Sequence, residues 1–192
     1  MTVTEASRWT VSRVPRITQQ LREDHYELLW RAESLRLFGD AVAGPPAVWL
    51  PELDDVLALL RSQVLVHVRA DDYGLYPVVA VLLGGLRATA TMAREHRQIV
   101  EFITELAALR GCLENTSVSP APDVVQRLQR LAYGLHAVLQ THLEKEILLY
   151  LPVLDERLTP ERAGDMFGAM ARAAAKAHDQ LRESTPTSGD TT

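Results

Sequence analysis

Apolar residues recur every three or four positions along most of the chain, which is the spacing that places side chains on one face of an α-helix. This period runs through four long stretches, and a shorter fifth stretch begins at Thr159-Pro160-Glu161, a typical helix start. The long stretches are residues 16–38, 52–76, 86–110 and 122–150. No stretch alternates with period two, so the sequence predicts an all-α helical bundle with essentially no β-sheet.

Proline and glycine residues set the expected boundaries of these helices. The segment 39–51 contains two Gly and three Pro residues, so the second helix is predicted to begin near Pro51 or Glu52. Gly111 is predicted to end the third helix, because glycine commonly follows the last helical turn.

Length and composition are typical of one soluble globular domain, with 192 residues of which 47% are hydrophobic and 23% charged. We expect residues 1–15 to form an N-terminal arm, 16–183 one helical domain and 184–192 a disordered tail. The net charge of −5 argues against nucleic acid or an anionic membrane as partners, and the longest apolar run, residues 78–86, is too short to span a membrane. The N-terminus lacks the apolar run of a secretory signal and Cys112 is the only cysteine, which together predict a cytoplasmic protein without an internal disulfide.

One arrangement of polar residues occurs twice within the helical stretches. In each copy a His is followed by a carboxylate four residues later and by a Pro ten residues later: His67, Asp71, Pro77, and His142, Glu146, Pro152. Residues four apart lie on one helical face, so each copy directs an imidazole and a carboxylate the same way. Each proline removes a backbone donor and clashes with the preceding turn, so both helices are expected to end or kink just beyond these residues.

The first and third helices each add one histidine on or beside the apolar stripe, His25 and His96. Four imidazoles and two carboxylates in one bundle core would be costly without compensation, and a metal centre supplies it. Imidazole suits iron, zinc and copper, whereas carboxylates that can bridge favour a pair of iron or manganese ions. The predicted metal ligands are His25, His67, Asp71, His96, His142 and Glu146.

Each His–carboxylate pair taken alone could be a surface ion pair, which stabilises a helix by roughly 0.2–0.5 kcal/mol. Two copies with matched prolines favour the metal site instead. His136 lies six residues before His142, about 240° around the helix, so we expect it to face elsewhere and to be structural.

These residues resemble the hemerythrin-like, or HHE cation-binding, domain family. The resemblance covers roughly residues 16–155 and rests on His25 and on the segments 67–77, 95–100 and 142–152. It implies an up-down four-helix bundle with an additional C-terminal helix in this chain. It also implies two non-haem iron ions, joined by an oxo or hydroxo bridge and by the carboxylates of Asp71 and Glu146.

The sequence departs from the oxygen carriers of that family in two places. Carriers have a second His one turn from the third-helix His, whereas Met92 and Val100 flank His96 here. The second-helix carboxylate is Asp71 rather than the more usual Glu, so the bridge must sit closer or Asp72 must share the task. Both departures favour a reactive or sensory site over reversible oxygen carriage.

The sequence supports three functional hypotheses. The first is a cytoplasmic di-iron protein that binds or senses O2, peroxide or NO, with no nucleic-acid or membrane partner. The alternative is a di-iron oxidase or oxygenase acting on a small-molecule substrate, which leaves open whether the protein is an enzyme. The third, a metal-free interaction bundle, requires the six candidate ligands to diverge in space.

Overall fold

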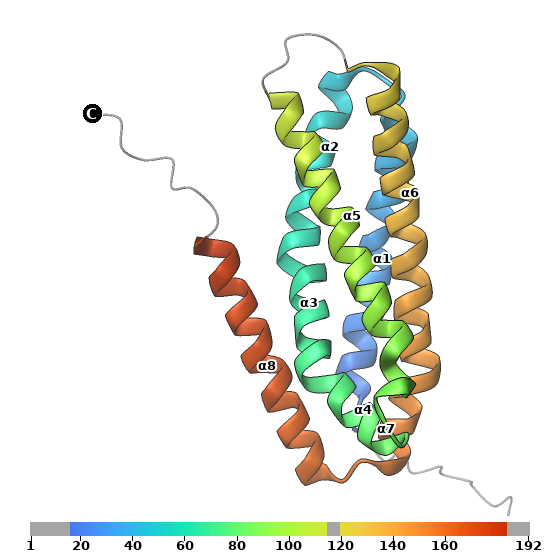
Figure 1. Ribbon diagram of the computed structural model, residues 1–192, viewed down its shortest axis with the longest axis vertical. Coiled ribbons are helices and arrows are strands. Elements are labelled where there is room, and N and C mark those ends of the chain that lie inside the picture. Colours follow the sequence, from blue (N-terminus) through green and yellow to red (C-terminus); the bar gives the residue numbers. More distant parts are fainter. Residues whose placement is uncertain (1–15, 115–119, 184–192) are drawn as a thin grey trace, which may run out of the picture.

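The computed structural model describes residues 16–114 and 120–183, and the regular elements in these ranges are helices (Figure 1). The predicted arm, residues 1–15, and the predicted tail, residues 184–192, lie outside the described residues. The described part of the chain contains no strand, so the all-α prediction is confirmed there.

Four helices form the bundle and a fifth lies beside it. The first bundle helix is α1 (Gln19–Ala41). The second is a continuous series of segments: α2 (Pro46–Leu59), the π turn η1 (Leu60–Val64), α3 (Leu65–Ala70), the π turn η2 (Asp71–Leu75) and α4 (Tyr76–Leu82). The third is the 3-10 turn η3 (Leu86–Thr89) followed by α5 (Ala90–Glu114). The fourth comprises α6 (Pro122–Lys145), the π turn η4 (Glu146–Tyr150) and α7 (Leu151–Arg157), and the additional helix is α8 (Pro160–Glu183).

The bundle helices run alternately up and down, and α8 lies on the outside (Figure 1). α1 and α5 each pack against both α2 and α6. α8 packs against α3 and η2, so it covers the second bundle helix. The predicted up-down bundle with an additional C-terminal helix is therefore confirmed. Among the described helices, none is long and apolar enough to cross a membrane.

The core consists of two apolar clusters, one toward each end of the bundle. The α2-end cluster includes the fully buried Trp49, and the α4-end cluster includes the fully buried Leu75. On α5, His96 lies between Met92 of the α4-end cluster and Ile99 of the α2-end cluster. The candidate ligands on the other bundle helices occupy the same level, so the polar site lies between the two clusters.

The second bundle helix begins at Pro46, and the predicted start near Pro51 or Glu52 is wrong. Pro46 occupies the first turn, where the missing amide proton removes no hydrogen bond. The indole of Trp49 is fully buried and donates to the carbonyl of Gly44 at 3.1 Å. Burial of this side chain anchors the early start, and Pro51 then removes only one hydrogen bond near the beginning of the helix.

The third bundle helix also runs further than predicted, because α5 continues through Gly111 to Glu114. A helix tolerates one glycine at a cost of about 1 kcal/mol relative to alanine. Among the described residues, Gly84 and Gly85 have positive φ angles, 86° and 144°, and they form the turn between the second and third bundle helices.

The two prolines of the repeated arrangement follow π turns that begin at the candidate carboxylates. η2 begins at Asp71 and precedes Pro77, and η4 begins at Glu146 and precedes Pro152. The wider turn relieves the clash between the proline ring and the turn before it, so the helix distorts but continues. Figure 1 shows α4 turning away from the line of α3 at this point. The sequence predicted that both helices end or kink at these prolines. Neither helix ends there, and the distortion of each helix is a π turn.

Gly74 provides a test of how α8 is attached to the bundle. A Cβ atom at Gly74 would lie 2.2 Å from Cγ and 2.8 Å from the backbone N of Met170, so α8 leaves no room for it. We predict that Gly74→Ala lowers the free energy of unfolding by about 1–3 kcal/mol, the usual cost of overpacking.

Gly164→Ala is the matched control for this substitution. A Cβ atom at Gly164 meets nothing within 4 Å, so the control should raise the free energy of unfolding by about 0.5–1 kcal/mol. Urea unfolding measures both changes. Equal stability of the two variants would contradict the tight contact between η2 and α8.

Candidate metal centre

The six candidate ligands converge from all four bundle helices. They are His25 on α1, His67 on α3, Asp71 at the start of η2, His96 on α5, His142 on α6 and Glu146 at the start of η4. Five of them are buried, each at most 2% exposed, and the His67 side chain is 15% exposed. The metal-free interaction bundle required these side chains to diverge, and they do not.

The four imidazoles form two pairs with Glu146 between them. The rings of His25 and His67 are 5.0 Å apart, and Nε2 of His96 lies 3.0 Å from Nε2 of His142. Glu146 Oε2 lies 2.9 Å from Nε2 of His25 and 3.5 Å from Nε2 of His67. Glu146 Oε1 lies 3.6 Å from Nε2 of His142. One oxygen of the carboxylate therefore faces each imidazole pair.

Asp71 is the second carboxylate of the cluster. Its Oδ2 lies 3.0 Å from Nε2 of His67. Together with His142 and Glu146, these residues offer four potential ligand atoms that all lie within 4.8 Å of one another. The spacing of four residues in each copy thus brings both carboxylates to the same point in the bundle.

Groups around the cluster orient three of the imidazoles. Their Nδ1 atoms donate to outer acceptors: Leu21 O at 2.5 Å from His25, Asp72 Oδ1 at 2.8 Å from His96, and Glu95 Oε2 at 3.1 Å from His142. An acceptor at Nδ1 holds the ring proton there and leaves the Nε2 lone pair directed into the cluster. This is the arrangement in which histidines bind metal ions in proteins.

The inward-facing atoms fit a bound cation. Nε2 of His67 and both oxygens of Asp71 are buried without a hydrogen-bond partner among the described residues, since the 3.0 Å between His67 and Asp71 lacks hydrogen-bond alignment. Unpartnered buried groups cost about 1–3 kcal/mol each. The distance of 3.0 Å between Nε2 of His96 and Nε2 of His142 also fits two ligands of one metal ion. Two imidazole nitrogens that each lie about 2.1 Å from an ion, at right angles to one another, are about 3.0 Å apart.

Tyr76 lies at the cluster, although it was not among the ligands predicted from the sequence. Its hydroxyl donates to Glu146 Oε1 at 2.6 Å and lies 3.2 Å from His96 Nε2 and 3.4 Å from His142 Nε2. On a regular α-helix, residues five apart such as Asp71 and Tyr76 lie about 140° apart. The π turn between them brings both side chains to one face, a geometry that spacing does not reveal.

Glu95, Asp72 and Lys145 also have roles that the sequence did not indicate. Asp72 contacts His96 from outside the cluster, so the alternative in which it shares the bridging task is wrong. Glu95 accepts from both His142 and Lys145. Glu95 directly precedes His96 in the sequence, yet it accepts from His142 on another helix. This contact depends on the packing of α5 against α6.

The remaining histidines lie outside the cluster. His136 Nε2 lies 3.1 Å from Glu33 Oε2 on α1, which agrees with its predicted structural role. His178 on α8 is exposed.

Burial and charge act against each other in the cluster. Burial alone would raise the pKa of Glu146, but the surrounding imidazoles, with His142 the strongest, outweigh it and hold that pKa well below its usual range. Burial alone would lower the pKa of His67, but the carboxylates, with Asp71 the strongest, raise it well above its usual value. Burial and the nearby carboxylates raise the pKa of Tyr76, so its phenol keeps its proton. In the metal-free protein, protonated His67 thus supplies positive charge that a metal ion would supply when bound.

A pocket of about 360 Å³ gives access to one imidazole pair. His25 and His67 line it, and apolar walls come from Leu28, Ala70 and, on α8, Met170. His67 is the most exposed of the candidate ligands, so this pocket connects the centre to solvent.

A four-helix bundle that encloses two imidazole pairs and two carboxylates has the arrangement of a metal site built in a bundle core. Residues 16–154 match the family model described as Hemerythrin HHE cation binding domain. The match spans most of the chain, so the protein belongs to the hemerythrin HHE cation-binding domain family. No curated protein matches the chain, and no solved structure does.

The pKa shifts predict how the stability of the metal-free protein depends on pH. Because the pKa of His67 is raised in the folded protein, its imidazole adds to the free energy of unfolding. This stabilisation is fully present below the pKa of the unfolded chain, about 6.5, and is lost as the pH rises through the pKa of the folded protein. Because the pKa of Glu146 is lowered in the folded protein, its carboxylate also adds to the free energy of unfolding. This stabilisation is present above the pKa of the unfolded chain, about 4.5, and is lost as the pH falls through the pKa of the folded protein. We therefore expect greatest stability between these two unfolded values and a loss at alkaline pH.

Urea unfolding in the presence of a chelator measures this dependence. His67→Gln should abolish the alkaline loss, because glutamine does not titrate, whereas the control His178→Gln should retain it. A metal-free protein whose stability rose steadily above neutral pH would contradict the prediction.

Proposed function

We propose that the protein is a hemerythrin-like non-haem di-iron protein that binds or senses O2, peroxide or NO. The observation that carries this proposal is the position of Glu146, which directs one carboxylate oxygen to each imidazole pair. A carboxylate placed in this way is suited to bridge two ions. A single ion would leave one imidazole pair without a partner.

The residues divide naturally between two ions. His25 and His67 would hold one, His96 and His142 would hold the other, and the carboxylates would join them. Imidazole and carboxylate donors without thiolate, in a site that can bridge two ions, favour iron or manganese over a structural zinc site. Iron held in this way supplies redox chemistry and coordination positions at which a small ligand exchanges.

Tyr76 gives the two halves of the centre different chemistry. Its hydroxyl lies beside the His96–His142 pair, and its raised pKa keeps the proton on the oxygen. Tyr76 Oη therefore keeps a hydroxyl that donates a hydrogen bond to Glu146 and could donate one to a small ligand bound nearby instead. The described residues that line the pocket beside the His25–His67 pair include no tyrosine. This asymmetry supports a reactive or sensory site over simple carriage.

One observation favours the second candidate, a di-iron oxidase or oxygenase. The pocket beside His25 and His67 has a volume of about 360 Å³, within the range of small-molecule sites, and its walls are largely apolar. A gas ligand needs only a narrow channel, so the extra room could admit a small apolar substrate.

Iron loading tests the di-iron proposal. Protein purified anaerobically with iron should contain about two irons per chain and develop oxo-bridge absorption in the near ultraviolet when exposed to air. Asp71→Ala and His142→Ala should lose this iron, and His136→Ala is the control that should keep it. One zinc ion unaffected by both substitutions would contradict the proposal.

Oxygen uptake by the loaded protein separates the two candidate functions. Uptake that stops at a fixed ratio to protein supports binding or sensing. Uptake that continues with a small reductant or apolar substrate supports an oxidase or oxygenase.

The outer carboxylate Glu95 provides a finer test of the ligand set. Glu95→Gln should weaken iron binding by about 10–100-fold, because it removes the carboxylate that orients His142. Iron titration against a chelator of known affinity measures this change. Glu105→Gln, which removes a surface partner of Arg127, is the matched control and should leave affinity unchanged. Equal affinities of the two variants would show that the Glu95 carboxylate does not support iron binding through His142.

A further inference from the structure

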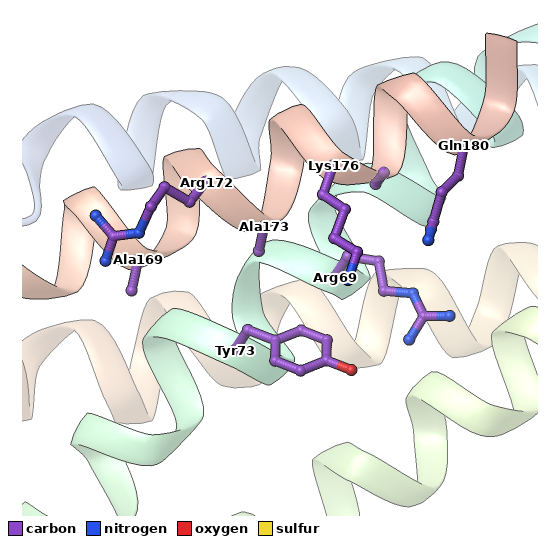
Figure 2. Close-up of a pocket in the computed structure, with 8 residues that line it drawn as sticks. Arg69, Tyr73, Ala169, Arg172, Ala173, Lys176 and Gln180 are labelled. Carbon is purple, nitrogen blue, oxygen red and sulfur yellow. The ribbon is translucent and has the colours of Figure 1, made fainter. Parts of the chain in front are cut away.

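A second pocket lies between the bundle and α8, and none of the six candidate ligands lines it. It has a volume of about 410 Å³. Arg69 and Tyr73 form one wall, from α3 and η2, and Arg172, Lys176 and Gln180 line the α8 side (Figure 2). α8 lies beyond the residues that match the family, so this pocket is not part of the family's common bundle.

The charge of this pocket is opposite to that of the protein. Its lining contains three basic residues and no Asp or Glu, although the whole chain carries a net charge of −5. Within residues 16–114 and 120–183, Arg69, Arg172 and Lys176 form no ion pair with a carboxylate. Arg110, by contrast, pairs with Asp54 at 2.7 Å. Three cations in one pocket, none of them paired with a carboxylate among the described residues, create a positive potential that attracts an anion.

The positions of the side chains suit an anion with an organic part. Figure 2 shows Lys176 extending from α8 toward Arg69 and Tyr73, while Arg172 lies at the other end of the pocket. Guanidinium and ammonium groups together are the usual partners of a phosphate. Tyr73 is 64% exposed and offers a ring face for stacking. Alanines at positions 169, 173 and 177 follow one face of α8 and leave the space between the helices open.

We propose that this pocket binds a small organic phosphate. The phosphate lies between Arg69 and Lys176, and the organic part lies against Tyr73 and the alanines of α8. The volume exceeds what a phosphate ion alone would fill, which is the reason for assigning the organic part. This proposal does not depend on the metal centre, although Arg69 and Tyr73 lie two residues on either side of Asp71.

Calorimetric titration of the full chain tests the proposal, with adenosine monophosphate, inorganic phosphate, adenosine and citrate as probes. We expect the nucleotide to bind more tightly than the other three. Arg69→Gln and Lys176→Gln should each weaken it by about tenfold or more, because each removes a charge-assisted hydrogen bond. Arg87→Gln removes one exposed positive charge outside the pocket and should leave the affinity unchanged.

Ala173→Leu provides a variant that keeps every charge but fills the pocket. It should abolish nucleotide binding while circular dichroism shows an unchanged helix content. No binding of the nucleotide, equal binding of citrate or inorganic phosphate, equal weakening by Arg87→Gln, or unchanged binding by Ala173→Leu would each overturn the proposal.

Discussion

The carboxylate of Glu146 is the group on which the alignment of the bundle depends. It is completely buried between two apolar clusters, where an uncompensated charge would cost several kcal/mol. Its oxygens find partners only when His25 on α1, His67 on α3 and Tyr76 on α4 reach the same level. Sliding one helix by a single turn, about 5.4 Å, would remove its partner. The polar cluster therefore sets the register of the helices, which apolar stripes alone leave open.

Local spacing predicted what depends on local geometry. The helical period identified the bundle helices, and the interval of four residues placed His67 with Asp71 and His142 with Glu146, because both features are properties of one helix. The stop predicted at Gly111 and the late start of the second helix were wrong, since burial of Trp49 and the surrounding packing outweighed local breaking signals. Contacts between helices depend on how the helices are rotated against one another, which local spacing does not determine.

The residues that the sequence missed all act across a boundary between elements. Glu95 on α5 orients a histidine of α6, and that contact depends on how the two helices are rotated. Tyr76 reaches Glu146 because a π turn lies between Asp71 and Tyr76, and a period of 3.6 residues assigns it to another face. Prolines ten residues after each histidine marked where the helices distort, but the distortion itself determines which side chain enters the site.

α8 lines both the pocket beside His25 and His67 and the basic pocket that contains Arg69, Arg172 and Lys176, although it lies outside the residues that match the family. One face of α8 contributes Met170 to the pocket beside His25 and His67, and another contributes Lys176 to the basic pocket. Both pockets border the segment from α3 to η2, which carries His67 and Asp71 and against which α8 packs. Any displacement of α8 thus alters access to the His25–His67 pair and the shape of the basic pocket together. The bundle supplies the candidate ligands, whereas α8 shapes what reaches them from this side.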